Sequence, residues 1–314
     1  MTKQPLSVEK QLNRLLERGL SLGDGQRADA ERLLLDTNYY RLSGYWRYFQ
    51  IDPEHNNDAF QPNVTFNDIV EFVEMDALMR NILLKGLAVF EIAFRSHFAY
   101  YATVLAKDPC IYDSAGSYKD IELPPLTDGS RTIRQAKPLD KLLDKIHEDI
   151  GKSKDDCIEH FRMHDKPIPM WAAIEVLSFG TVSQMFELWA DSKCKSKVAN
   201  SFEGFGSWSK FESVPHALSV LRNICAHHGR LWNRIMPVTP VMLEQVKDRH
   251  EKQSAYRNTV WSDVVMLQFY VDSLAGNTAF SESIKSLLAD KYAYVKGLKH
   301  PFRRDQELSG RSKH

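Results

Sequence analysis

The sequence predicts an all-α protein, and two observations on its apolar residues support this prediction. Apolar residues recur at three- and four-residue intervals over long stretches, whereas the alternation typical of β-strands is nowhere sustained. The chain has 314 residues, of which 43% are hydrophobic and 26% are charged, as in an ordinary globular protein. It contains no internal repeat and no low-complexity tract. We therefore expect a helical bundle with a small N-terminal helical module and extra helices near the C-terminus.

Residues 1–64 are expected to form the N-terminal module and a linker. Two leucine stripes predict its first helices: Leu12, Leu15, Leu16 and Leu20, and then Leu33, Leu34 and Leu35. A Gly-Asp-Gly turn separates the two stripes, and residues 51–64, with Pro and Asn pairs, indicate a linker or exposed loop.

Residues 65–240 are expected to form the main helical domain. A long apolar-periodic segment predicts a helix from 66 to about 106, and a proline-containing loop follows up to 138. Shorter helices are predicted at 139–150, 153–164, 171–178, 181–190 (opened by a capping box at 181–184) and 213–228. In the last of these, Ser213 is the expected cap, Pro215 lies in the first turn and Gly229 is the stop.

Residues 241–300 are expected to add two amphipathic helices, near 257–275 and 281–297. Residues 301–314 then form a basic tail that we expect to be flexible, since chain ends usually are. The alternative is that the basic residues of this tail contact RNA.

Charge and cysteine content restrict the classes of function. Forty-one basic and forty-one acidic residues cancel, so any contact with nucleic acid must come from a local basic patch. The first residues resemble neither a signal peptide nor a transit peptide, and no apolar run is long enough to cross a membrane. The four cysteines are far apart and form no C-x-x-C pair. We expect a cytoplasmic protein with reduced thiols.

The pair Arg222 and His227 is the strongest candidate for catalysis. A guanidinium holds a phosphate through its fork of donors, and an imidazole changes charge near neutral pH and moves protons. Together these groups are able to break a phosphodiester without a metal ion. The alternative is an ordinary solvated helix face or packing pair, which is the commoner meaning of so short a motif.

Helical geometry refines this candidate pair. At about 100° per residue, Arg222, Asn223, Ala226 and His227 fall on one side of the helix, away from the predicted apolar stripe. His228 is expected to turn back towards that stripe. We therefore expect His227 to be the catalytic histidine and His228 to have a structural role.

The densest aromatic patch, at residues 38–49, interleaves rings with arginines. We expect most of these rings to form the core of the N-terminal module. The alternative is a platform for single-stranded RNA, of which this composition is also typical, with Tyr45 and Trp46 as candidate stacking rings. Arg41 and Arg47 are the candidates for phosphate contact in either case.

Two further groups of side chains are of interest. Glu91 and Arg95 are four residues apart inside a strongly apolar stretch, where an isolated charge is expensive. They are either a helix-surface salt bridge or a pair that orients the motif residues. Cys157, His160 and His164 share a helix face, but no second ligand pair accompanies them, so we expect no metal site. The sequence also has no nucleotide-binding glycine loop and no Gly-x-Ser-x-Gly motif, and we expect no cofactor.

Four sequence blocks together resemble, in order, those of the Abi-like bacteriophage-resistance family, in its AbiD/AbiF branch. They are NYYRLSGY at 38–45, FEIAFR at 90–95, WAAIEVLSFGT at 171–181 and RNICAHH at 222–228. Beyond about residue 240 nothing resembles that family.

The resemblance implies a HEPN-like helical domain whose Arg and His motif marks metal-independent endoribonucleases. Arg222 and His227 would be the catalytic pair, and Asn223 would match the polar residue that commonly follows the arginine. The resemblance also implies a small structured RNA as a partner. Because one motif supplies one histidine, whereas transesterification benefits from an acid and a base, we expect a homodimer.

Two other functions remain open at this point. One is a non-catalytic RNA-binding or scaffold protein, in which Arg222 and His227 only hold phosphate. The other is a toxin that an RNA or protein antitoxin keeps inactive, with the same chemistry and different regulation.

Overall fold

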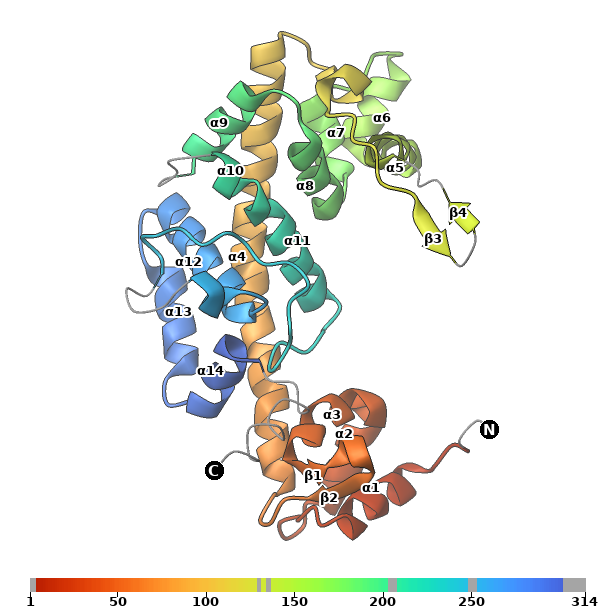
Figure 1. Ribbon diagram of the computed structural model, residues 1–314, viewed down its shortest axis with the longest axis vertical. Helices are drawn as coiled ribbons and strands as arrows, with labels where there is room; N and C mark the ends of the chain where they lie inside the picture. The colour runs from red at the N-terminus through yellow and green to blue at the C-terminus, as the bar shows by residue number, and fades with distance from the viewer. Residues whose placement is uncertain (1–3, 129–130, 134–136, 203–207, 248–252, 302–314) are drawn as a thin grey trace. The chain divides into compact units, whose positions relative to one another are not determined.

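The computed structural model describes residues 4–128, 131–133, 137–202, 208–247 and 253–301. Helices dominate these residues, so the predicted all-α class is confirmed. The helices are α1 Val8–Glu17, α2 Arg27–Thr37, α3 Tyr39–Trp46, α4 Phe66–Ala106, α5 Pro138–Lys152, α6 Asp156–Met163, α7 Met170–Val176, α8 Phe179–Leu188, α9 Ser192–Asn200, α10 Trp208–Phe211, α11 Ser213–Ala226, α12 Val260–Ala275, α13 Ala279–Leu288 and α14 Tyr292–Lys299 (Figure 1). None of the described helices is long and apolar enough to cross a membrane.

The chain divides into two compact units. The first comprises residues 1–81, 228–235 and 286–314, and the second comprises residues 82–227 and 236–285. The division does not follow chain order as the sequence prediction does, because a short segment after α11 and the C-terminal residues belong with the N-terminal ones. The predicted basic tail lies outside the described residues, apart from Pro301.

Unit 1 packs an aromatic core around Trp232. The ring of Trp232 lies 4.1 Å from that of Phe72 on α4 and 5.0 Å from that of Tyr48. Gly297 on α14 allows this packing, since a Cβ there would meet the indole at 2.3 Å. A short antiparallel ribbon, β1 Gln50–Asp52 with β2 Asn57–Phe60, occupies part of the stretch that the sequence predicts to be a linker.

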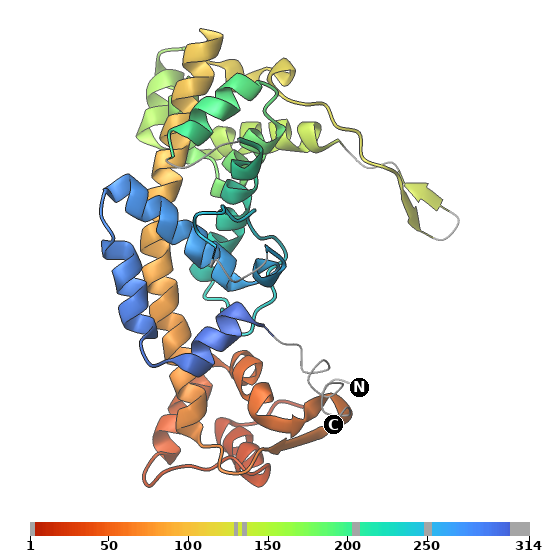
Figure 2. The ribbon, with the colours of Figure 1, turned by 60° about the vertical axis from the view of Figure 1, so that its left-hand side comes forward.

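Unit 2 is built around the phenylalanines of α4. Phe90, Phe94 and Phe98 are fully buried. The ring of Phe94 meets Phe186 of α8 edge-on at 5.3 Å, and Phe90 lies 5.3 Å from Tyr270 of α12. Both ribbon views show α8, α11 and α12 beside this part of α4, with the ribbon of β3 Leu126–Asp128 and β4 Arg131–Ile133 extending away from the helices (Figure 2).

Several element limits differ from the sequence prediction. The hydroxyl of Ser178 caps α8 by accepting from the N–H of Thr181, so the predicted capping box at 181–184 lies inside the helix. The helix predicted at 281–297 is two helices, because the chain turns at Asp290, whose φ is 59°. The polar helix α9 was not predicted from the sequence. Its many lysines obscure the helical spacing of the short buried face, which is made by Cys194, Val198 and Ala199.

Asp263 on α12 is a carboxyl group buried without a full set of partners. Its side chain is inaccessible, Ser262 donates to Oδ2 at 3.3 Å, and Oδ1 meets no donor among the described residues. Burial raises the pKa of Asp263 well above its usual range. The folded protein therefore holds a proton that the unfolded chain releases above about pH 4.

We predict that Asp263→Asn alters the pH dependence of stability. The wild-type free energy of unfolding, compared with that of the variant, should fall as pH rises from about 4 to the raised pKa, by up to about 1.4 kcal/mol per pH unit. Urea denaturation of both proteins at several pH values measures the difference. Parallel profiles for the two proteins would contradict a protonated Asp263.

Candidate functional site

Helix α11 carries the Arg222 and His227 pair, and its apolar stripe anchors it as predicted. Val214, Ala217, Leu218, Leu221 and Cys225 are all fully buried, and α11 packs against α8 and α12. Ile224, expected in the same stripe, is only half-buried.

The start of α11 is fixed by a buried lysine and not by the expected serine cap. Ser213 donates its hydroxyl hydrogen to the carbonyl of Lys210, and Glu212 before it already has helical backbone angles. Lys195 of α9 is inaccessible to solvent and donates to the carboxylate of Glu212 and, at 2.7 Å, to the carbonyl of Glu187. Because a buried ammonium needs such partners, Lys195 holds the residue from which α11 begins.

The end of α11 exposes both histidines. The helix ends at Ala226, and the N–H of His227 donates to the carbonyl of Asn223 at 3.0 Å. His228 follows with a left-handed φ of 55°, so the helix does not reach Gly229. The expectation that His228 turns back to the apolar stripe is wrong, because the helix stops before it and its side chain is exposed.

Arg222, Asn223 and His227 share the solvent-facing side of α11, as helical geometry predicts. Asn223, Ala226 and His227 are exposed, and the side chain of Arg222 retains 28% of its accessible surface. Ala226, between Arg222 and His227 in the sequence, has a small side chain and is itself exposed.

Glu91 of α4 lies between two arginines. Its Oε1 accepts hydrogen bonds from Arg95, of which the Nε bond is 3.1 Å long, and its Oε2 lies 3.8 Å from the Nε of Arg222. Arg95 also donates to the carbonyl of Ile174 on α7, so its guanidinium is held at both ends. The structure thus brings the predicted Glu91 and Arg95 pair to the motif arginine.

Arg222 retains hydrogen-bonding capacity in this arrangement. A separation of 3.8 Å is too long for a hydrogen bond, and the buried Nε of Arg222 meets no acceptor among the described residues. One carboxylate against two guanidiniums leaves the cluster of Glu91, Arg95 and Arg222 with a net positive charge. This net charge is suited to an oxyanion, which would meet the exposed part of the Arg222 side chain and not its buried Nε.

His97 also lies on α4, but no described contact joins it to Arg222. Its Nδ1 is 2.7 Å from the hydroxyl of Ser201, and its ring packs 5.0 Å from Phe202. Partial burial lowers the pKa of His97, which favours the neutral ring. His97 is therefore a packed histidine in this structure.

The aromatic patch of unit 1 is mostly core. Tyr45 and Trp46 are each 3% exposed, so their rings present no face for a stacked base and the prediction that they bind RNA is wrong. They are buried because they lie on the face of α3 that packs into the N-terminal module. There the ring of Trp46 meets that of Tyr39 edge-on at 4.7 Å. Arg41 and Arg47 are exposed, and Arg47 pairs with Glu54 at 2.8 Å.

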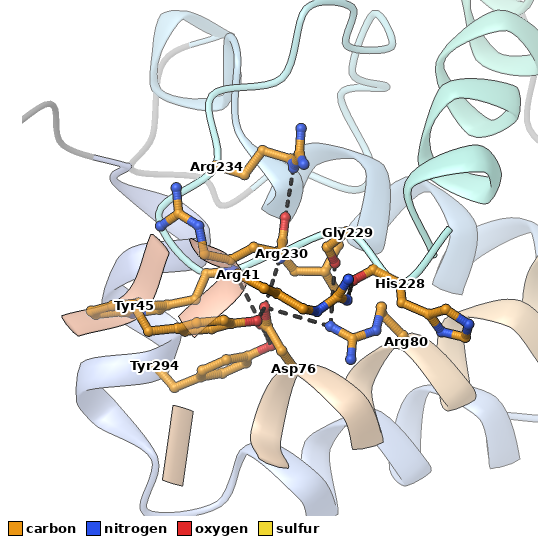
Figure 3. A network of polar contacts seen from close by, with 11 residues as sticks. Arg41, Tyr45, Asp76, Arg80, His228, Gly229, Arg230, Arg234 and Tyr294 are labelled. Atoms are coloured by element: carbon orange, nitrogen blue, oxygen red, sulfur yellow. Dashed lines mark hydrogen bonds and ion pairs between the residues drawn. The ribbon is translucent and has the colours of Figure 1, made fainter. Parts of the chain in front are cut away.

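The buried carboxylate of Asp76 was missed by the sequence reasoning. It accepts hydrogen bonds from the hydroxyls of Tyr45 (2.7 Å) and Tyr294 (2.6 Å) and from the N–H groups of Leu231 (2.8 Å) and Trp232 (3.0 Å) (Figure 3). These bonds fix the chain segment of unit 1 that follows the motif. Its signal in the sequence was an acid and an arginine four residues apart in an apolar stretch, as for Glu91 and Arg95.

The candidate cysteine and histidine set does not gather into a site. The thiol of Cys157 donates to the carbonyl of Ala172 at 3.8 Å, and burial raises its pKa to about 11. The Nδ1 of His164 faces the carbonyl of His160 at 2.7 Å. In the part of the chain that the structure describes, no group of three or more His, Cys, Asp or Glu side chains is arranged to hold a metal ion.

We predict that Glu91→Ala destabilises unit 2 by about 3 kcal/mol or more, because it leaves the nearly buried Arg95 without its carboxylate. The double variant Glu91→Leu/Arg95→Met should recover most of that loss, since it removes both charges and keeps the volume. Denaturant unfolding of the wild type and the two variants measures both effects. An additive loss in the double variant would contradict the coupling.

Comparison with known proteins gives one match. A family model described as Abi-like protein matches residues 32–233, well over half of the chain. The matched interval contains α11, Glu91, Arg95 and Asp76. No curated protein and no solved structure matches the chain.

Proposed function

The chain belongs to the family of Abi-like proteins, and from that premise we propose that it is a metal-independent endoribonuclease. Membership of this family indicates a role in abortive infection, the defence of bacteria against phage. The proposal adds an activity to that role: cleavage of RNA by its own 2′-hydroxyl at the exposed side of α11.

One observation carries the proposal. The partly exposed Arg222 lies beside Glu91 on α11, and the exposed His227 follows directly at the end of the same helix. A guanidinium with free donors binds a phosphate, and an exposed imidazole transfers protons near neutral pH. No other pair on the described helices was predicted from the sequence to combine these two groups.

The chemistry balances with these two side chains and the RNA itself. The 2′-oxygen loses its proton, attacks the adjacent phosphorus and forms a new P–O bond, while the bond from phosphorus to the 5′-oxygen breaks and that oxygen gains a proton. His227 acts as the base or the acid in one of these transfers, and Arg222 stabilises the charge on the five-coordinate phosphorus. The products are a 2′,3′-cyclic phosphate and a 5′-hydroxyl.

The neighbouring residues act on this pair. Asn223 follows Arg222 on the exposed side and offers an amide donor to the same phosphate. Glu91, fixed by Arg95, orients the guanidinium of Arg222 from the protein side. His228 is exposed and supports the site as a second imidazole beside His227.

A homodimer supplies the second acid or base, because each chain contributes one motif. Exposed apolar side chains support this part of the proposal: Val89, Ile92, Tyr100 and Val104 on α4 and Trp171 on α7. A cleft of about 410 Å³ lies between these two helices and is lined by Tyr100, Val104 and Trp171. Ile92 is 68% exposed and adjoins Glu91, so a second copy covering this surface would lie beside the arginine cluster.

We predict that wild-type protein cleaves RNA in excess EDTA and leaves 2′,3′-cyclic phosphates. His227→Ala should cut about 10²–10⁴-fold more slowly, since it removes the proton-transfer group. Arg222→Lys should also be impaired, because an ammonium keeps the charge but not the fork of donors. Labelled total RNA with end-group analysis of the fragments measures all three.

The matched control for this experiment is His216→Ala. His216 lies on the same helix but faces Glu187, 3.9 Å away, so its loss should leave cleavage unchanged. Equal loss in His216→Ala and His227→Ala would contradict the assignment. No cleavage by wild type, with RNA co-purifying in every variant, would favour an RNA-binding scaffold or an RNA-silenced toxin.

We predict that Ile92→Glu weakens the dimer and lowers activity, because it places a charge on the exposed apolar surface. The specific activity of this variant should rise with protein concentration and recover towards that of the wild type. Sedimentation and initial rates at matched concentrations measure the effect. A wild-type monomer with full activity at micromolar concentration would contradict the dimer.

A further inference from the structure

Unit 1 carries a second group of arginines, separate from the cluster on α11. Arg41 of α3, Arg80 of α4 and Arg230 of the segment 228–235 belong to the network of polar contacts around Asp76 (Figure 3). We call these three residues the unit 1 arginine cluster. Its members come from three parts of the chain, so only the folded unit assembles it.

Among the described residues, Asp76 is the carboxylate that contacts this cluster, and it compensates little of the positive charge that the cluster presents to solvent. Asp76 is inaccessible to solvent, and four hydrogen bonds from two tyrosines and two backbone N–H groups already surround it. Its nearest guanidinium, that of Arg80, is 3.7 Å away and also donates to the carbonyl of Gly229 at 3.2 Å. Asp76 and Arg80 are therefore held in defined positions at the buried side of the cluster.

Arg41 and Arg230 have donors to spare. Arg41 is exposed and donates one Nη to the carbonyl of His228. Arg230 lies over the ring of Tyr48, with its guanidinium carbon 5.0 Å from the ring centroid, and its buried Nη1 has no acceptor among the described residues. Neither arginine forms an ion pair with any acidic residue in the part of the chain that the structure describes. A buried donor without an acceptor is costly, so the guanidinium of Arg230 gains if an added acceptor reaches it.

An exposed aromatic ring directly precedes Arg41 in the sequence. Tyr40, the residue before Arg41 on α3, is 86% exposed, unlike the buried Tyr45 and Trp46. Arginines with unused forks bind phosphate oxygens, and an exposed ring beside them stacks a base. Inorganic phosphate would use the arginines alone, whereas a single-stranded nucleic acid uses the ring as well.

We propose that Arg41 and Arg230, fixed by the Asp76 network, form a phosphate-binding site for single-stranded RNA on unit 1, with Tyr40 stacking a base. This inference rests on RNA being the substrate, as proposed above. It assigns the binding of RNA to residues that take no part in the cleavage chemistry. Substitutions at these residues should therefore weaken RNA binding without removing the catalytic groups.

The test measures binding of a fluorescent single-stranded RNA to full-length His227→Ala protein, in which cutting is suppressed, at several salt concentrations. Arg41→Gln/Arg230→Gln in this background should bind roughly tenfold or more weakly. The slope of log K against log salt should become shallower by about 1.4, since each lost phosphate contact removes about 0.7 for a single strand. Tyr40→Ala should weaken binding and leave the slope unchanged.

The matched control is Arg14→Gln/Arg32→Gln, which removes the same charge from exposed positions of unit 1 on α1 and α2. It should leave both affinity and slope near those of the parent. Thermal unfolding of every variant identifies any loss of folding, and Arg230→Lys, which keeps the charge, should retain the parent slope if the site contacts phosphate.

Three outcomes would overturn the proposal. They are equal slopes in the Arg41/Arg230 variant and its parent, an equal loss in the control, and competition by inorganic phosphate as effective as that by RNA. Each of these leaves the cleavage reaction untouched, because cyclic-phosphate formation by wild type is measured separately. Conversely, loss of cleavage in wild type with an intact salt slope would refute the nuclease and retain the RNA site.

Discussion

The carboxylate of Glu91 is the constraint on which the proposed site depends. It lies in an apolar part of α4, where an unpaired charge would be strongly unfavourable, and it is shared between Arg95 and Arg222. Arg95 donates hydrogen bonds to Oε1 of Glu91, whereas the Nε of Arg222 lies 3.8 Å from Oε2, which is too long for a hydrogen bond. The motif arginine is therefore held beside Glu91, and 28% of its side-chain surface remains exposed for a phosphate.

Helix α4 uses the same arrangement twice. In each unit a carboxylate is followed four residues later by an arginine, as Asp76 by Arg80 and Glu91 by Arg95. Each carboxylate then binds a group from a distant part of the sequence: Asp76 the backbone of 231–232 and Glu91 the side chain of Arg222. Burial makes these partnerships obligatory, and this is why both arginine groups occupy defined positions.

The sequence predicted the fold class and the solvent-facing side of α11 because both depend on local periodicity. The burial of Val214, Leu218 and Leu221 follows from spacing alone, and so does the exposure of Asn223 and His227. The end of α11 was placed too late, since the left-handed turn at His228 depends on contacts made by the segment after it.

Long-range partners were not predictable from one sequence. Asp76 meets Tyr294 across 218 positions of the chain, and no local pattern encodes that pairing. The burial of Tyr45 and Trp46 depends on the same tertiary contacts, so composition alone did not distinguish these core rings from the exposed Tyr40. Glu91 and Arg95, a charged pair in an apolar stretch, carried a local signal that led to the site, whereas the same signal at Asp76 and Arg80 was overlooked.

The most direct test of the account uses an RNA in which the protein cuts one mapped linkage. Replacing the ribose on the 5′ side of that linkage with a single 2′-deoxyribose removes the proposed nucleophile and nothing else. The account predicts that this linkage is no longer cut while binding persists. Continued cleavage there would show that water or a protein group is the nucleophile, and would contradict the assignment of His227 and Arg222 to transesterification.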